Sequence, residues 1–295
     1  ADGQNDDRFD LVFDLSLTNE GEQHSLSAAA GPHAVFSSFT IPAEASSLLV
    51  KKIEKRRLKL ACYQLLKQLY PEVAAPWGSL TGIRPTKLFR ELTQEGGVES
   101  ARDMFTGLFD VSAEKTALAE SICTVQEPYI NSVSSNDIDL YIGIPYCRTK
   151  CLYCSFPSEV LSKKSHLEEY LAALKREIEA GAELVKQNGF RVRSFYMGGG
   201  TPTVLTAEQL EDLLSFTLEQ FGSFGLESTV EAGRPDTIDR EKLEAFKRFG
   251  VSRISINPQT MNDATLLRVG RAHTAADVVR VYELAREVGF DSINM

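Results

Sequence analysis

The sequence lacks any long apolar run. Hydrophobic residues make up 43% of the 295 residues, but no stretch of about 18 consecutive apolar residues occurs, so no membrane span is predicted. Positive charge is also in deficit, because 32 Lys and Arg stand against 41 Asp and Glu. The formal net charge of −9 argues against a dedicated nucleic-acid-binding protein. The first residues are polar and acidic, which excludes a secretory signal there, and we expect a cytoplasmic location.

Cysteine is sparse too, and its odd count of five argues against a disulfide framework in a chain without a secretory signal. Cys62 and Cys123 lie in apolar helical patterns and are expected to be small core residues. The other three, Cys147, Cys151 and Cys154, follow a short apolar run with the spacing C-x3-C-x2-C. Three thiolates can hold three corners of a four-iron cluster and leave the fourth iron open to a small molecule.

Zinc is the competing metal for this cysteine triplet. Structural zinc sites take four ligands, whereas only His166 follows the triplet nearby, so iron–sulfur binding is the favoured interpretation.

The first part of the chain, residues 1–134, predicts a small α+β region. Alternating apolar and polar residues predict strands over 8–17 and 33–40, joined by a polar stretch rich in Ser, Ala and Gly. Helical patterns cover 44–69, a short segment from about 86 after a turn over 81–87, and 113–132.

The helix predicted over 44–69 is rich in positive charge and carries one acid, Glu54, within its cationic segment. The six cations are Lys51, Lys52, Lys55, Arg56, Arg57 and Lys59. We interpret them as a solvated helix face, and a site for an acidic partner or a nucleic acid is the alternative.

Residues 135–295 form the second predicted domain, in which strands alternate with longer helices. Strands are expected at 139–145, 194–197, 228–232, 253–257 and 292–295, and helices at about 164–187, 207–221, 240–249 and 275–288. Thr206 with Gln209 forms a capping box, Thr274 is an N-cap, and Gly250 and Gly289 stand at helix ends. This alternation predicts βαβ units and a parallel sheet. The last run has no strand after it and residue 1 is not Met, so we expect a piece of a longer protein.

Polar or glycine signals end each of the first four strands, where catalytic and binding groups of parallel α/β folds gather. The cysteines follow the first strand and the glycine run 198–200 ends the second. Glu231 ends the third strand, and Asn257 and Gln259 end the fourth. Glycines without Cβ atoms allow a ligand to reach the backbone, so this edge is a candidate cofactor site.

These motifs resemble the radical S-adenosylmethionine (SAM) enzymes, and among them the oxygen-independent coproporphyrinogen III oxidase family. That HemN/HemW-like family includes the dehydrogenase, haem chaperones and a HemZ-type branch. The resemblance rests on the cysteine triplet with Tyr153, on Tyr141-Ile-Gly-Ile-Pro145, and on Gly198-Gly-Gly-Thr-Pro-Thr203. The runs 231–236, 256–262 and 81–85 are most similar to the HemZ-type branch. The implied fold is α/β, a partial (β/α)6-type barrel after a small N-terminal α+β region.

The resemblance implies a [4Fe-4S] cluster on Cys147, Cys151 and Cys154, with SAM on the open iron. It implies that Tyr141, Gly199 and Glu231 contact that SAM. Five further residues match positions that contact a second SAM in that family, namely Tyr153, Gly200, Thr201, Gln259 and Arg271. No side chain is assigned a catalytic role, because the cofactor carries the radical step.

The implied activity is oxidative decarboxylation of coproporphyrinogen III propionates to vinyl groups, with protoporphyrinogen IX as product. An electron donor such as flavodoxin or ferredoxin would cleave SAM to methionine and a 5′-deoxyadenosyl radical. Phe156 stands where the best-known dehydrogenases carry a further cysteine, which is closer to the haem-chaperone branch. A haem chaperone that retains the cluster and SAM is therefore the main alternative, and a radical SAM enzyme for another substrate is a third.

Overall fold

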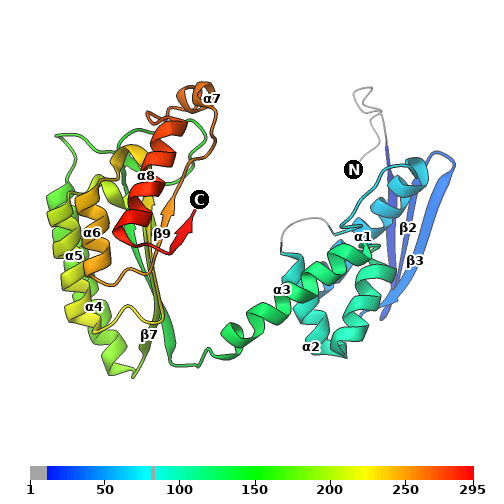
Figure 1. Ribbon diagram of the computed structural model, residues 1–295. Coiled ribbons are helices and arrows are strands. Elements are labelled where there is room, and N and C mark those ends of the chain that lie inside the picture. The colour runs from blue at the N-terminus through cyan, green and yellow to red at the C-terminus, as the bar shows by residue number, and fades with distance from the viewer. Residues whose placement is uncertain (1–11, 81–83) are drawn as a thin grey trace. The chain divides into compact units, whose positions relative to one another are not determined.

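The computed structural model describes residues 12–80 and 84–295 and divides the chain into two units, one ending at Ser132 and the other spanning Val133–Met295 (Figure 1). The start of the strand predicted over 8–17 and residues 81–83 of the predicted turn lie outside the described residues. No helix among the described residues is both long and apolar enough to cross a bilayer.

The first unit begins with a three-stranded antiparallel meander, β1 (Asp14–Glu20), β2 (Gln23–Ala30) and β3 (His33–Thr40). Helix α1 (Ser47–Leu69) starts at Ser46, whose side chain accepts the Leu49 N–H, and packs Ala61 and Leu65 against one sheet face. A second core joins α2 (Pro85–Asp103), the π-helical turn η1 (Met104–Leu108) and α3 (Ala113–Asn131).

Strand β2 corrects the sequence analysis, which assigned this stretch to a polar connection. Buried Leu26, Ala28 and Ala30 alternate with serines and Ala29, so the stretch is half-buried at period two. Small alanines on the packed face hide this pattern, because alanine alone is a weak strand signal. Helix α2 is also longer than the short segment predicted from about residue 86.

The second unit is a five-stranded parallel sheet in the order β10-β9-β8-β7-β4. The strands are β4 (Asp137–Ile144), β7 (Arg191–Gly199), β8 (Glu227–Gly233), β9 (Arg253–Ile256) and β10 (Ser292–Asn294). The helices are α4 (Leu167–Gln187), α5 (Ala207–Phe221), α6 (Arg240–Arg248), α7 (Asp263–Arg268) and α8 (Ala275–Val288). Short turns η2 (Pro202–Val204) and η3 (Pro235–Thr237) follow β7 and β8, and β5 (Tyr146–Cys147) pairs with β6 (Glu159–Val160). The predicted α/β partial barrel is confirmed.

The two faces of this sheet differ. On one face Ile142, Ile144 and Met197 are buried in a core that α4, α5, α6 and α8 complete (Figure 1). On the other face the side chains of Tyr141 and Tyr196 are exposed, as in the open interior of a partial barrel. The capping box at Thr206, the N-cap at Thr274 and the left-handed Gly289 stand as predicted, and Thr274 forms a full capping box with Asp277. Helix α7 was not predicted.

Candidate functional site

The open face of the sheet carries a ladder of aromatic and acidic side chains. Tyr141 and Tyr196 are paired in the β4–β7 register, and their rings stack with centroids 6.0 Å apart. The Tyr196 hydroxyl donates a hydrogen bond of 2.5 Å to the Glu231 carboxylate. Burial and this carboxylate raise the pKa of Tyr196, so its hydroxyl remains a donor at neutral pH. The ladder thus holds Glu231 at the carboxyl end of β8 with one oxygen engaged.

The glycine run at the end of β7 lies directly against the chain that leads into the cysteines. The Gly200 N–H donates to the Ile144 carbonyl at 2.8 Å, and the Thr201 N–H donates to the Tyr146 carbonyl at 2.8 Å. A Cβ on Gly200 would stand 2.5 Å from that same Tyr146 oxygen, and Gly199 has a φ of +104°. Only glycine therefore permits this close approach of two backbones.

A predicted cluster ligand, Cys147, and a predicted SAM contact, Thr201, lie next to each other where the end of β7 meets the chain leading into the cysteines. The Thr201 hydroxyl lies 3.5 Å from the Cys147 Sγ and can donate to it, and Thr201 is 2% exposed. The run from Cys147 to Ser158, here called the cysteine loop, then crosses the carboxyl edge of the sheet before β6.

A buried arginine anchors the cysteine loop. Arg234 is 3% exposed and donates to the Thr149 carbonyl at 3.1 Å and to the Thr149 hydroxyl at 2.5 Å. Its Nε pairs with Asp236 at 3.0 Å. Thr149 in turn donates to the Gly270 carbonyl at 2.9 Å. These contacts fix the middle of the loop to the segments after β8 and α7.

Arg271 lies beside the later part of the cysteine loop. Its guanidinium donates to the Asn257 carbonyl at 2.9 Å. Burial raises the pKa of Tyr153, while the nearby Arg271 acts to lower it. The buried Arg271 Nε has no partner among the described residues. A buried guanidinium with a free donor suits a carboxylate, which it can bind through two nitrogens.

The donor set fits a metal cluster only in part. All five cysteines are free thiols of intermediate exposure. In the described ranges, no three His, Cys, Asp or Glu side chains are gathered closely enough to hold a metal ion. The three loop thiols are therefore present on one short segment but not drawn together, so an assembling cluster would have to gather them.

Gln259 is the predicted site residue that the structure leaves apart. It follows β9 with a left-handed φ of +65°, and its exposed side chain has no hydrogen bond within the described chain. Sequence reasoning in turn missed Tyr196, Arg234, Asp236 and Thr149 as parts of the site. Tyr196 had a signal, because it stands two residues before the glycine run on the same strand face.

Buried His273 completes the support behind the loop. It is 2% exposed, its Nε2 lies 3.3 Å from the Pro258 carbonyl, and its Nδ1 lies 3.8 Å from Asp236. Burial lowers the pKa of His273, so the ring is neutral at pH 7 and its Nε2 can donate to the carbonyl.

Comparison with known proteins agrees with this geometry. The family model of the radical SAM superfamily matches residues 141–295. The oxygen-independent coproporphyrinogen-III oxidase-like protein HemZ of Bacillus subtilis is 34% identical over 97% of this chain and 58% of its own length. The heme chaperone HemW of Bacillus subtilis is 37% identical over 52% of this chain and 40% of its own length.

A solved structure gives the same fold. Coproporphyrinogen III oxidase (HemN) from Escherichia coli, described as a radical SAM enzyme, matches with a TM-score of 0.50 and 28% identity over 58% of this chain and 39% of that one. The chain thus spans less than two thirds of the length of each of these relatives. The chain belongs to the radical SAM superfamily, whose members use a [4Fe-4S] cluster and SAM, and to its HemN/HemW-like proteins.

Proposed function

We propose that this chain carries the radical SAM part of an oxidoreductase that decarboxylates coproporphyrinogen III to protoporphyrinogen IX. The observation that carries the proposal is the contact of Thr201 with Cys147, which joins a predicted SAM contact to a predicted cluster ligand. The names of HemZ and of the HemN structure support the substrate class. A cytoplasmic location and a flavodoxin- or ferredoxin-type electron donor belong to the same proposal.

In this proposal Cys147, Cys151 and Cys154 hold the cluster, and the carboxyl edge of the sheet holds SAM. A bound cluster and SAM supply one-electron chemistry that can remove a hydrogen atom from an unactivated carbon. Glu231, oriented by Tyr196, accepts hydrogen bonds from ribose hydroxyls or an amino group. Tyr141 and Gly199 lie on either side of the same part of this SAM site.

The remaining predicted residues would orient a second anionic ligand, a second SAM or a substrate propionate. Arg271 offers its unpartnered Nε to a carboxylate, and Tyr153, whose pKa Arg271 influences, stands on the cysteine loop nearby. Gly200 and Thr201 fix the end of β7 against the Ile144–Tyr146 backbone beside this ligand, and Gln259 adds an exposed amide.

A haem chaperone with the same cofactors is the second candidate, because Phe156 stands where the best-known dehydrogenases carry a cysteine and the HemW relative of Bacillus subtilis matches 52% of the chain. Haem iron needs an axial ligand such as His, Cys, Met or Tyr. Of the four histidines, His24 and His273 are buried, whereas the His166 side chain is 76% exposed and 3.0 Å from Glu169.

The test is anaerobic reconstitution of the full-length protein with iron and sulfide, followed by SAM, dithionite and coproporphyrinogen III. Formation of protoporphyrinogen with 5′-deoxyadenosine supports the oxidoreductase. Cleavage of SAM without loss of CO2, together with stable haem binding, would establish the chaperone instead. An Arg271→Lys variant keeps the charge but loses the second nitrogen, so we expect a raised KM for the carboxylate-bearing ligand.

A further inference from the structure

The first unit contains a cavity whose lining includes none of the residues assigned to the radical SAM site. It measures about 440 Å³, within the range of small-molecule sites, and all its lining residues come from the first unit. They are Lys52, Lys55, Arg56, Lys59, Trp77, Ser79, Leu80, Arg84, Pro85, Leu88 and Phe109, here called the cationic cavity.

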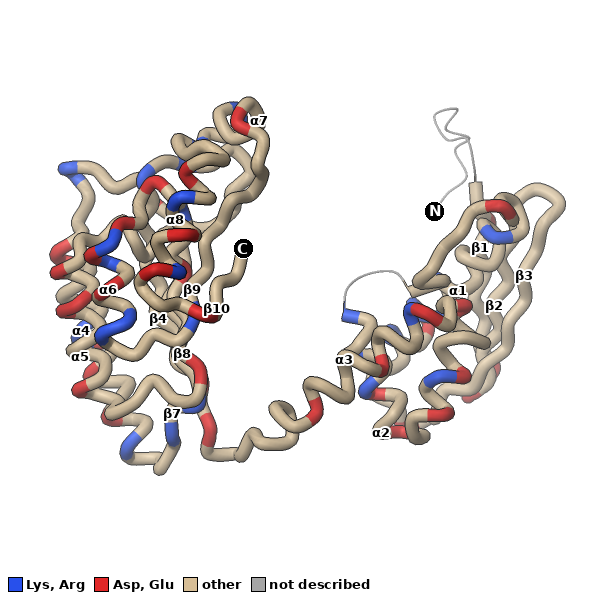
Figure 2. The backbone as a smooth tube through the Cα atoms, in the orientation of Figure 1, with Lys and Arg blue, Asp and Glu red and all other residues tan. Residues whose placement is uncertain are grey.

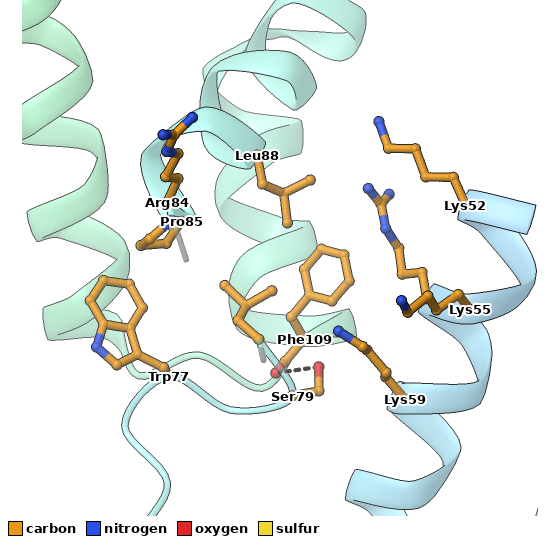
Figure 3. A pocket seen from close by; sticks show the side chains of 11 residues that line it. Lys52, Lys55, Lys59, Trp77, Ser79, Arg84, Pro85, Leu88 and Phe109 are labelled. Atoms are coloured by element: carbon orange, nitrogen blue, oxygen red, sulfur yellow. Dashed lines mark hydrogen bonds between the residues drawn. The ribbon is translucent and has the colours of Figure 1, made fainter. Parts of the chain in front are cut away.

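One wall of the cavity is a row of cations on α1. Lys52, Lys55, Arg56 and Lys59 recur every three or four residues and so share one helix face over roughly 10 Å. Figure 2 shows the cations along α1, and Figure 3 shows Lys52, Lys55 and Lys59 lying along that side. Only some cations of α1 line the cavity. Lys51 is not among the lining residues, and the Arg57 guanidinium carbon lies 5.2 Å from the Phe39 ring centroid instead.

The opposite side is apolar and aromatic. Trp77, Pro85, Leu88 and Phe109 face the α1 row across the cavity, and Arg84 stands beside them with a left-handed φ of +66° (Figure 3). Pro85 is the first residue of α2, so the positive end of that helix dipole also lies at the cavity.

The floor is held rigidly. The Ser79 N–H and hydroxyl both donate to the Phe109 carbonyl, at 2.8 and 3.1 Å. A Cβ on Gly78 would stand 2.0 Å from that oxygen, so the two segments are in closest contact there. The cavity is therefore built from hydrogen-bonded backbone and is not a gap between loose side chains.

The α1 wall is tied to the floor at one end and to α2 at the other. Tyr63 and Lys67 hold Asp110 at 2.6 and 2.5 Å, and Lys52 pairs with Glu91 at 3.2 Å. Between these ties, Lys55, Arg56 and Arg84 have no carboxylate partner in the described part of the chain. The chain as a whole is acidic, with a net charge of −9, yet these three cations lie together beside the apolar side of the cavity. An anionic ligand could neutralise them there.

We propose that the cationic cavity binds a small organic polyanion that has a flat apolar body and at least two acid groups. The apolar body lies against Trp77, Leu88 and Phe109, and the acid groups lie between the α1 row and Arg84. A nucleoside polyphosphate and a tetrapyrrole polycarboxylate share this chemistry. All lining residues belong to the first unit and none is a residue assigned to the radical SAM site, so the inference holds or fails independently of the proposed function.

Trp77 makes the proposal directly measurable, because it is the only tryptophan of the chain. The experiment titrates the 295-residue protein with ATP, with coproporphyrin III and with inorganic tripolyphosphate, and follows Trp77 fluorescence and the heat of binding. We expect saturable binding of ATP or coproporphyrin III, and the one that binds identifies the source. Tripolyphosphate should bind at least about tenfold more weakly, because it has no apolar body to cover the apolar side of the cavity.

The matched variants are Lys55→Glu inside the cavity and Lys51→Glu outside it. Both lysines are exposed residues of α1. Loss of a charge-assisted contact should weaken binding in Lys55→Glu by about tenfold or more, and Lys51→Glu should stay within about twofold. Equal binding by both variants would overturn the proposal, as would tripolyphosphate binding as tightly as ATP. A response of Trp77 to a single-stranded oligonucleotide alone would overturn the assignment to a small molecule.

Discussion

The cysteine loop and the cationic cavity are held in different ways. The cavity takes its walls from a long helix and from backbone segments that are hydrogen-bonded to one another. The cysteine loop is anchored at Thr149 by Arg234, but its three thiols are not gathered together. The cavity is thus organised by packing, whereas the cysteine loop is fixed at Thr149 and still needs a cluster to bring its thiols together.

The largest expected effect falls on the cluster. Cys147→Ala should abolish formation of the four-iron cluster, because three thiolates are the fewest that the open-iron arrangement allows. Cys123→Ala is the matched control, since that thiol donates to the Thr86 carbonyl in the first unit and burial raises its pKa. The measurement is iron and sulfide content with electron paramagnetic resonance after anaerobic reconstitution. A Cys147→Ala protein that keeps four irons would end the ligand assignment.

The next effect tests the anchor of the loop. Arg234→Ala removes a buried guanidinium, takes from the largely covered Asp236 carboxylate its nearest cation and releases Thr149, which should cost about 3 kcal/mol of unfolding free energy. Arg240→Ala removes an exposed pair with Glu287 and should cost less than about 1 kcal/mol.

Urea unfolding can distinguish the unfolding transition of the unit with the cysteine loop from that of the unit with the cationic cavity. Circular dichroism follows both units, whereas Trp77 fluorescence follows only the first. We expect Arg234→Ala to leave the Trp77 transition unchanged. A shift of that transition by the same amount would show that the two regions unfold as one and would remove the distinction between them.

The smallest effect concerns acid stability. Arg191 lowers the pKa of Asp137 from 3.8 to about 2, and Lys67 and Tyr63 lower the pKa of Asp110. A folded-state pKa below the unfolded value means that the stability is present above pH 3.8 and is lost as the pH falls, for Asp137 through about 2. The melting temperature of Asp137→Asn should therefore lie below that of the parent at pH 7 and approach it at pH 2.

The same test with Asp110→Asn reports on the first unit, where this carboxylate ties α1 to the cavity floor. The Trp77 transition should show the loss near neutral pH. A difference between Asp110→Asn and the parent that grew as the pH fell would contradict the sign of the pKa shift.

Much of the second unit could be predicted because its signals are local. Alternating apolar strands, the capping pairs at Thr206 and Thr274, and Gly289 each depend on neighbours within a few residues. The cysteine triplet and the glycine run are local too. Strand β2 was missed because alanine and serine alternate there, so a small residue occupies the buried face where a large apolar one marks a strand.

The residues missed at the site depend on contacts between distant positions. Arg234 meets Thr149 across 85 residues, and Tyr196 meets Glu231 across 35. No local pattern shows that an arginine will be buried or which partner will neutralise it. The cations of α1 were noted in the sequence, but their sorting into cavity wall and solvated face depends on Trp77 and Phe109, which only folding brings opposite them.

The pairing of β4 with β7 also bears on the order in which the chain acquires structure. Strands β1 and β2 meet at Glu20 and Gln23, a tight hairpin, whereas Arg191 reaches Asp137 across 54 residues and a whole helix. Closing a long loop costs more chain entropy before any contact rewards it, so such pairings form slowly. As the chain leaves the ribosome, the meander can therefore close before β7 has been made, and the pairing that sets the cysteines beside the glycine run forms later.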